Sequence, residues 1–126
     1  PRAGWPAGSD LRVYVTELRE IGPAAPLTAD DERDIGSRIV NHNCPASRER
    51  MVRANLRLVV AIARNYSGRG LTLADLIEEG NIGLLRAVER FDPAQDARFS
   101  TCASWWIKQA IRQALLHTVQ PVDVSA

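Results

Sequence analysis

Residues 99–118 read FSTCASWWIKQAIRQALLHT, and this stretch decides the fold class. Its apolar residues recur at intervals of three and four, which is the spacing of one side of an α-helix. Ser100 is the expected N-cap, so the pattern predicts a helix over about 101–118. The side expected to pack against the rest of the protein carries Ala103, Ile107, Ala110, Ile111 and Ala114, with Trp106 at its edge.

The first forty residues predict a pair of helices. Apolar residues at 11–21 recur with helical spacing, and Asp10 is a candidate N-cap. The Gly- and Pro-rich segment 22–26 ends this helix. Thr28 then opens a second one, because Asp31 stands where a capping box places its acidic partner.

The middle of the chain predicts its longest helix, over 48–66. A turn-rich segment at 41–47 separates it from the preceding helix, and Ser-Gly-Arg-Gly at 67–70 ends it. Thr72 and Asp75 form a further capping-box pair, which predicts that another helix starts there.

The next helical segment contains glycine. We expect a break near Gly80, a new helix capped by Asn81, and an end just before Pro93. Residues 93–98 are predicted to form a loop, and residues 120–126 an extended tail. No segment alternates as a strand does, so the sequence predicts an all-α fold, a compact bundle of about five or six helices.

Length and composition fit a single soluble domain. The chain has 126 residues, of which 45% are apolar and 25% charged, enough for one packed core. We expect the domain to span 10–119, with a helix pair at 10–40 and a core at 48–119, after an extended or disordered leader at 1–9. The longest fully apolar run, 58–63, is far shorter than the ~18 residues that a membrane span needs.

Sequence motifs for catalysis and metal binding are absent. The chain has no glycine-rich phosphate loop, no G-x-S-x-G elbow and no H-E-x-x-H pair. Cys44 and Cys102 lie far apart, and we expect both to stay reduced, as in an intracellular protein. His42 and Cys44 could supply half of a metal site, but a structural zinc site needs four ligands. The sequence therefore predicts neither an enzyme nor a bound metal or cofactor.

Charge is unevenly distributed, although the formal net charge is only +1. Residues 48–70 carry six arginines and one glutamate, and residues 98–118 carry three basic residues and no acid. Residues 71–90 carry four acids against two arginines, and residues 10–40 seven acids against four arginines. Such blocks indicate one basic and one acidic face, and so two kinds of partner.

A second side of the predicted 101–118 helix has an unusual composition. It carries Cys102, Trp105, Gln109 and Arg112, with Gln113 at its border. Large aromatic side chains beside Arg and Gln suit stacking on unpaired bases and contacts to phosphates. The alternative is that both neighbouring indoles, Trp105 and Trp106, belong to one wide core stripe, which is the more common outcome for such residues.

Longer motifs resemble a known family. They are NLRLVVAIARNY at 55–66, GRGL at 68–71, DLIEEGNIGLLRAVERFDP at 75–93, FST at 99–101 and WWIKQAI at 105–111. In length and order they closely resemble the second conserved domain of bacterial sigma factors of the housekeeping type, without a gap from about 48 to 116. Weaker matches, RVY at 12–14 and PLT at 26–28, resemble the helix pair that precedes this domain. The resemblance implies a promoter-specificity subunit of RNA polymerase.

In this family the domain docks on a coiled coil of the largest polymerase subunit. The resemblance carries the docking positions onto Leu56, Asp75, Glu78, Glu79, Asn81 and Leu85. The carboxylates among them belong to the acidic block, and would meet basic residues of the coiled coil. For Leu56 and Leu85, simple burial in the core is an equally good expectation.

The resemblance also implies that the domain opens the minus-ten promoter element and reads the non-template strand. Contacts carry over onto Phe99, Thr101, Trp105, Trp106, Gln109 and Arg112, with the indoles at the upstream edge of the bubble. One flipped base would enter a pocket beside Arg98 and Phe99, and a second would sit near Asn55, Leu58, Ser100 and Thr101. Arg12 and Tyr14 resemble residues that touch the strand just downstream. Cys102, Lys108 and Gln113 complete the expected set.

The chain departs from the family pattern at base-capturing positions. Cys102 stands where the family usually has an aromatic ring that stacks on the flipped base, and Ala97 replaces a second aromatic residue. Gln113 replaces a basic residue, and the basic run that usually follows reads VQPVDVSA at 119–126. The chain is therefore either a sigma-factor fragment that melts the minus-ten element or a sigma-like regulator that docks but has altered or lost melting. A helical scaffold without a nucleic-acid role is the third interpretation.

The resemblance implies partners and a location as well. We expect the polymerase core, promoter DNA and an anti-sigma protein as partners, and no membrane contact. The expected location is the bacterial cytoplasm, at the nucleoid. Family members usually carry two more helical domains, so this chain alone is not expected to direct transcription.

Overall fold

The structure, a computed structural model, describes residues 26–124, with side chains from 26 to 118. In this part of the chain the regular secondary structure consists of α-helices joined by loops, and no strand is present. The helices are α2 (Ala29–His42), α3 (Pro45–Ala54), α4 (Leu56–Arg64), α5 (Leu73–Arg90) and α6 (Phe99–Val124). The predicted all-α class is confirmed. The leader at 1–9, the helix expected from Asp10, and the contacts expected at Arg12 and Tyr14 lie outside the described residues.

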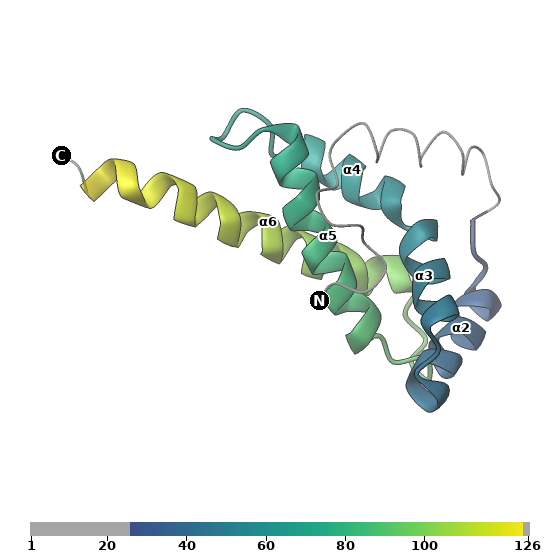
Figure 1. Ribbon diagram of the computed structural model, residues 1–126. Helices are drawn as coiled ribbons and strands as arrows, with labels where there is room; N and C mark the ends of the chain where they lie inside the picture. The colour runs from purple at the N-terminus through teal and green to yellow at the C-terminus, as the bar shows by residue number, and fades with distance from the viewer. Residues whose placement is uncertain (1–25, 125–126) are drawn as a thin grey trace.

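Helices α5 and α6 form the centre of the bundle. They share the largest interface of any helix pair in the described part, and α4 packs against both. Figure 1 shows α6 running alongside α5 and projecting past it, while α2 and α3 lie at the other end of the molecule. Across residues 26–124, no helix is long and apolar enough to span a bilayer.

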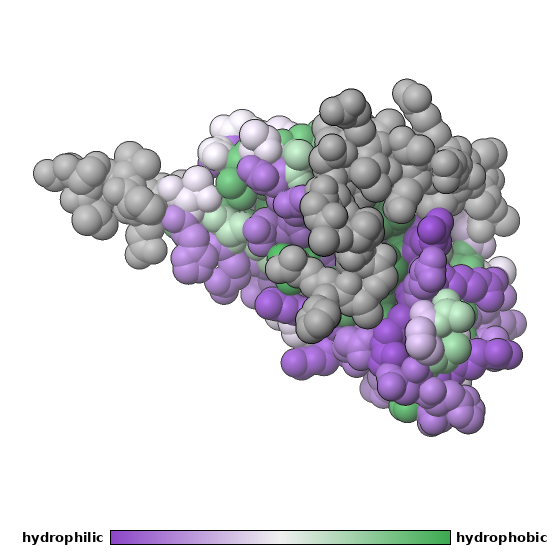
Figure 2. All heavy atoms as spheres, viewed as in Figure 1, coloured by the Kyte–Doolittle hydropathy of each residue, from purple (hydrophilic) through white to green (hydrophobic). Residues whose placement is uncertain are grey.

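One apolar cluster connects all five helices. Burying a Leu, Ile or Phe side chain completely stabilises a fold by about 1.5–3 kcal/mol. The residues with no measurable exposure are Met51, Val59, Ala63, Leu76, Leu84, Ala87, Phe99, Ala103, Ile107 and Ile111. The predicted apolar stripe of the last helix therefore does face the core. On the face shown in Figure 2, hydrophilic residues cover most of the described surface, with small hydrophobic patches between them.

Two helices start where their capping residues predict. The Thr28 N–H donates to Asp31 and the Asp31 N–H donates to the Thr28 hydroxyl, both at 3.0 Å, which completes a capping box at the start of α2. The Thr72 hydroxyl accepts from the Asp75 N–H at 3.1 Å at the start of α5. Local side chains thus satisfy backbone donors that no helical carbonyl can reach.

The predicted single helix over 48–66 is wrong, because it is two helices. α3 begins earlier, with Pro45 in its first turn, and ends at Ala54. Asn55 then interrupts the path, with φ −119° and ψ 11°. Its side-chain amide donates to the Met51 carbonyl at 2.8 Å, a local bond that competes with a regular helix. The chain therefore changes direction between α3 and α4.

The predicted break near Gly80 is also wrong. α5 is continuous from Leu73 to Arg90, and Asn81 lies in its middle rather than at a cap. Gly80 serves packing instead, since a Cβ there would lie 2.8 Å from the Val59 side chain of α4. At Gly83 the approach is closer still, because a Cβ would lie 2.4 Å from the Trp106 carbonyl oxygen of α6. Glycine thus lets α5 touch both neighbours closely.

The last helix is longer than predicted at both ends. It begins at Phe99, so Ser100 lies inside it and is not its cap. It continues to Val124, where an extended tail was expected. One proline removes a single helical hydrogen bond and does not have to end a helix, and no glycine follows Gly83 in the sequence to stop it.

Two Arg–Glu pairs tie distant parts of the chain together. Arg48 donates to Glu89 at 2.6 and 3.0 Å, which links α3 to α5. Arg98 donates to Glu32 at 2.9 and 3.3 Å, which links α2 to the start of α6. The loop between α5 and α6 is therefore held between these two connections.

Candidate functional site

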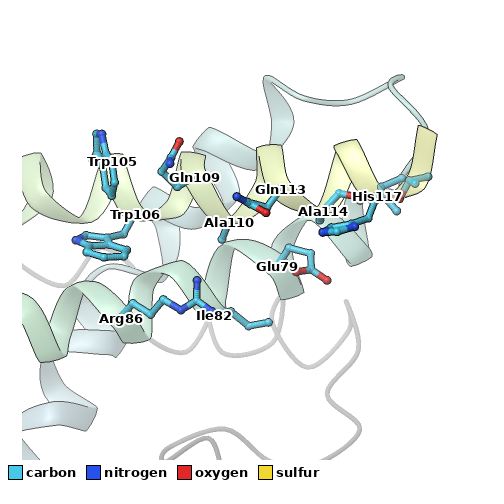
Figure 3. A pocket seen from close by; sticks show the side chains of 12 residues that line it. Glu79, Ile82, Arg86, Trp105, Trp106, Gln109, Ala110, Gln113, Ala114 and His117 are labelled. Carbon is cyan, nitrogen blue, oxygen red and sulfur yellow. Dashed lines mark hydrogen bonds between the residues drawn. The ribbon is translucent and has the colours of Figure 1, made fainter. Parts of the chain in front are cut away.

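The two tryptophans of α6 have different environments. Trp105 is 56% exposed, one of the most exposed large apolar side chains in residues 26–118, whereas Trp106 is half-buried. Their ring centroids lie 5.0 Å apart at an interplanar angle of 84°. Figure 3 shows Trp106 reaching toward α5 and Trp105 pointing away from it. The interpretation that both indoles are core residues is therefore wrong.

Polar and cationic side chains surround the exposed indole. Thr101, Lys108, Arg112 and Gln113 are exposed along α6, and Gln109 is half-buried. Neither Lys108 nor Arg112 has an ion-pair partner among residues 26–118. The predicted second face of the helix is thus a surface with an aromatic ring, amides and free cations.

A groove runs between α5 and α6 beside this surface. It encloses about 520 Å³, with Ile82, Ala110 and Ala114 among its apolar lining and Trp105 and Trp106 at one end. Its polar lining includes Glu79, Arg86, Gln109, Gln113 and His117, all of which Figure 3 labels. The groove is therefore lined both by Glu79, a predicted polymerase contact, and by predicted DNA contacts such as Trp105 and Gln109.

Two arginines of α5 belong to this region, and sequence reasoning missed them. The Arg90 guanidinium lies 5.2 Å from the centre of the Trp106 ring, a cation–π arrangement. Arg86, one turn earlier, lines the groove. Both stand three or more residues after Gly83, where α5 and α6 touch. The sequence signal that could have found Arg86 and Arg90 is their i,i+4 spacing, which places both on one side of α5, the side that a close helix partner would face.

The start of α6 presents its predicted base contacts unequally. Phe99 is completely buried and packs edge-to-face on Phe91, with ring centroids 5.3 Å apart at 87°. Its ring is therefore a core element and not a surface for stacking. Ser100 and Thr101 are exposed on the following turn. Arg98 is half-exposed, and its guanidinium already binds Glu32 and the Leu27 carbonyl.

The second predicted base pocket draws on α4. Asn55 and Leu58 are both half-buried, and Leu58 packs against the core. The Asn55 amide nitrogen is engaged with the Met51 carbonyl, which leaves its side-chain oxygen available as an acceptor. Helix α4 packs against α6. Leu58 on α4, Asn55 at its start, and the exposed Ser100 and Thr101 on α6 therefore belong to two helices in contact.

The cysteine at the expected stacking position is half-buried. Burial raises the pKa of the Cys102 thiol, and a hydrogen bond with Trp106 partly opposes that rise. A neutral, sheltered thiol offers no π surface. Cys102, which stands where the family pattern has an aromatic ring, thus lies next to the indoles.

The predicted docking residues separate into three groups. Asp75 and Glu78 are exposed on α5, with no ion-pair partner within the described side chains, and Leu85 is half-buried further along. Glu79 faces the groove instead. Leu56 and Asn81 are only 2% and 4% exposed. Leu56 is therefore a core residue, as the second expectation for it stated.

Asn81 is an exception to the usual pairing of buried polar groups. Neither its amide nitrogen nor its oxygen has a hydrogen-bond partner in the described structure. Leaving such a group unpaired costs about 1–3 kcal/mol. Its burial also keeps Asn81 away from any partner that binds the outer face of α5.

The candidate metal ligands do not assemble into a site. His42 is exposed at the end of α2, and Cys44 precedes α3. Hydrogen bonds with Ser47 lower the pKa of the Cys44 thiol. Among residues 26–118, no three His, Cys, Asp or Glu side chains are grouped so that they could hold an ion.

Comparison with known families gives a match to Sigma-70 region 2 over residues 51–118, more than half of the chain. The chain belongs to this family. The matched family is a region of sigma factors, which are transcription initiation factors rather than enzymes.

Curated relatives of this sigma region 2 chain are named RNA polymerase sigma factors. It is 49% identical over 114 residues to SigA from Bacillus sp and 52% identical over 105 residues to RpoS from Coxiella burnetii. It is 46% identical over 114 residues to SigA from Clostridium acetobutylicum. The matches cover 83–90% of this chain but only 29–30% of the relatives' lengths.

The family match covers both surfaces described above. Residues 51–118 include the exposed acids of α5, the groove and the Trp105 face of α6. They exclude Glu32, which the structure nevertheless brings onto the first residue of α6. The start of α6 is thus held by contacts from outside residues 51–118.

Proposed function

We propose that this sigma region 2 domain docks on the largest-subunit coiled coil of RNA polymerase and opens the minus-ten promoter element by capturing non-template bases. The observation that carries the proposal is the exposed Trp105 ring on a helix face with free cations and amides. Packing within the domain does not require an indole that is half-exposed to solvent. A single-stranded nucleic acid can bind such a ring, because each base has a face that can stack on it.

The energetics support melting without covalent chemistry. Stacking a base on an aromatic side chain contributes about 1–3 kcal/mol. Extruding a base costs a few kcal/mol. Trp105 together with hydrogen bonds from Ser100, Thr101 and Gln109 can therefore offset the cost of opening one or two pairs. Lys108 and Arg112 would bind phosphates, which gives affinity rather than sequence preference.

The acidic residues of α5 support docking on a basic partner. Asp75 and Glu78 are exposed, without an ion-pair partner among the side chains of residues 26–118, and half-buried Leu85 would give the same helix an apolar contact. We assign them, and not the buried Leu56 and Asn81, as the direct contacts. Glu79 lies in the groove and would act at the boundary between polymerase and DNA.

A second candidate function rests on Cys102. This residue is half-buried beside Trp106 and has no ring, so the flipped base would lose one stacking surface. A domain that docks but captures bases weakly would act as a sigma-like regulator that occupies polymerase. For either function we place the protein in the bacterial cytoplasm at the nucleoid, within reach of an anti-sigma protein.

Binding to a labelled oligonucleotide tests the DNA function. The parent should bind a non-template strand with TATAAT more tightly than the strand with its second base replaced, at two salt concentrations. Trp105→Ala should lower affinity at least about fivefold, the lower end of one lost stack. Leu116→Ala, at another exposed apolar residue of α6, is the matched control. An unselective parent that Trp105→Ala does not change would contradict base reading by the isolated domain.

The same assay separates the two candidate functions. Cys102→Tyr should tighten selective binding if the lost ring is the only defect. Unselective binding by both the parent and Cys102→Tyr, combined with normal polymerase binding, would instead favour the sigma-like regulator.

Binding to purified RNA polymerase core tests docking. Glu78→Lys should weaken it at least about tenfold, because it places like charges at a charge-complementary interface. Glu49→Lys makes the same charge change on the exposed surface of α3 and should have little effect. Equal effects of the two variants would show that only net charge matters and would contradict the assigned contact.

A further inference from the structure

The basic residues of this chain are chemically almost uniform. Sixteen of the 126 residues are Lys or Arg, and Lys108 is the only lysine among them. A lysine amine can be acylated once it has lost its proton, whereas an arginine guanidinium stays protonated in proteins and is not acylated by the same donors. Acyl transfer can therefore remove the positive charge of one basic residue of this sequence, and that residue is Lys108.

Lys108 lies on the exposed side of α6 that also carries Trp105 and Arg112. Trp105 stands three residues before it and Arg112 four residues after it, and residues at these spacings are neighbours on a helix surface. Neither Lys108 nor Arg112 has an ion-pair partner among the side chains of residues 26–118. The Lys108 amine is thus accessible to solvent and lies next to a second exposed cation.

The two helices around Lys108 carry no carboxylate that could hold its ammonium group. Residues 98–118 contain neither Asp nor Glu, and the same is true of α4, which packs against α6. Arg38 of α2 is different, because its guanidinium lies 3.3 Å from the Asp34 carboxylate. Since a surface with several cations and no acid attracts small anions, a negatively charged acyl donor should reach Lys108 more readily than a basic residue that is already paired.

Arg112 favours an acyl phosphate as that donor. A guanidinium binds a phosphate group through two parallel hydrogen bonds. One turn of helix separates Arg112 from Lys108, and the Cβ atoms of such neighbours lie about 5–6 Å apart. A phosphate bound by Arg112 would therefore bring the acyl carbon of the donor within reach of the Lys108 amine.

We propose that Lys108 is an acylation site on the DNA-binding face: an acyl phosphate bound by Arg112 transfers its acyl group to the Lys108 amine, which removes one of the cations that bind the DNA backbone. The effect on DNA rests on the proposed function, in which Lys108 binds a phosphate of the non-template strand. The modification would lower the affinity of the domain for DNA without changing its sequence preference, because phosphate contacts carry no sequence information.

The reaction needs no group beyond the donor and water. The Lys108 ammonium first loses a proton to water, and the amine nitrogen then attacks the acyl carbon. A carbon–nitrogen bond forms while the bond between the acyl carbon and the phosphate oxygen breaks. The phosphate leaves with the bonding electron pair and takes up a proton from the attacking nitrogen, directly or through water. No atom is oxidised or reduced, and the product is a neutral amide.

The rate of acetylation tests the site. Acetyl phosphate and the uncharged 4-nitrophenyl acetate donate the same acetyl group, and peptide mapping by mass spectrometry follows its appearance on Lys108. Arg112→Gln should lower the rate with acetyl phosphate, relative to the rate with the uncharged ester, at least about threefold, because it removes a positive charge close to a dianion. Arg53→Gln makes the same charge change on α3 and should leave that ratio unchanged. An equal ratio in the parent and Arg112→Gln would overturn the assignment of the donor site.

Binding to single-stranded DNA tests the consequence. The acetylated parent and a mock-treated sample are compared on the TATAAT strand and on an unrelated strand. Acetylation should lower affinity for both strands about two- to fivefold, the range of an exposed ion pair. The slope of log K against log salt should become less steep by up to about 0.7, one phosphate fewer neutralised on a single strand. Bound DNA should in turn slow the acetylation of Lys108.

A variant with its lysine elsewhere is the matched control. Lys108→Arg combined with Arg38→Lys moves the only lysine to α2, beside Asp34. Acetylation of this variant should leave its DNA affinity at the value measured before treatment. Lys108→Gln without any treatment should reproduce the affinity and salt slope of the acetylated parent, because glutamine is also neutral.

The outcomes separate this proposal from the proposed function. If acetylation of Lys108 leaves the affinity and the salt slope of the parent unchanged, the proposal is wrong and the proposed function stands. An equal loss of affinity in the variant with the relocated lysine would also overturn it, because net charge alone would then explain the effect. A parent that binds neither strand would overturn the proposed function, whereas the acetylation rates and their dependence on Arg112 would still test the site itself.

Discussion

The two long-range Arg–Glu pairs have similar geometry but opposite orientation. At the α3–α5 connection the arginine is the sheltered partner, with Arg48 23% and Glu89 51% exposed. At the α2–α6 connection the glutamate is sheltered, with Arg98 50% and Glu32 8% exposed. The inward arginine uses its donors to join two helices. The outward arginine leaves Nη1 without a partner in the described part of the chain, so the two connections differ in burial and not in pairing.

The largest expected difference between the pairs is in stability. Glu32→Ala removes the acceptor of the Phe99 N–H and should destabilise the domain by about 1–3 kcal/mol, the cost of an unsatisfied buried group. Glu89→Ala leaves a guanidinium that solvent reaches, and should cost no more than about 1 kcal/mol. Thermal unfolding of both variants measures the difference. Equal losses would show that the two connections are equivalent.

Replacing each arginine by lysine should affect function at only one connection. Lysine keeps the charge but not the planar donor edge, so Arg98→Lys should lower the TATAAT preference a fewfold, whereas Arg48→Lys should leave it unchanged. The oligonucleotide assay described above gives the ratio. A loss of preference in Arg48→Lys would mean that α3 also shapes the DNA-binding face.

A cysteine lies four residues from each arginine and reports on its surroundings. Hydrogen bonds with Ser47 lower the pKa of Cys44, and burial raises the pKa of Cys102. The thiolate is the reactive form, so Cys44 should be alkylated several times faster near neutral pH, and its rate should persist to lower pH. Single variants Cys44→Ser and Cys102→Ser separate the two rates. A faster rate for Cys102 would contradict its shelter beside Trp106.

Salt should produce the smallest difference. At about 1 M salt the screening length is about 3 Å, so an exposed pair loses most of its attraction. The stability difference between the parent and Glu89→Gln should therefore shrink with added salt, whereas that between the parent and Glu32→Gln should persist. Unfolding at low and high salt compares them. A salt-independent Glu89→Gln difference would place that pair in a drier environment than its exposure indicates.

The elements that could be predicted from the sequence are those fixed by local contacts. The starts of α2 and α5 follow from Thr28 and Thr72, whose partners lie three residues away. The start of α6 depends on Glu32, 67 residues before Phe99, and no local pattern contains that distance. Ser100 was therefore a reasonable but wrong choice of cap.

The role of the glycines in α5 cannot be predicted from local sequence for a related reason. A glycine inside a helical pattern predicts a break when only its flexibility is considered. At Gly80 the deciding factor is the Val59 side chain of α4, which occupies the space of a Cβ. Similarly, the burial of Phe99 depends on its contact with Phe91 at the end of α5, which the periodicity of α6 alone does not reveal, whereas that periodicity does place Trp105 on the second side of the helix.

The contact at Gly83 has a mechanical consequence for α6. A Cβ there would lie 2.4–2.8 Å from backbone atoms of Trp106 and Ile107, which no rotamer change can relieve. A larger side chain would tilt α6 about this point, and Thr118 lies about 18 Å further along the helix at a rise of 1.5 Å per residue. A tilt of about 5° would then displace that end by roughly 1.6 Å while hardly moving Trp105. Helix α6 would therefore pivot at its contact with Gly83, and its projecting C-terminal end would move most.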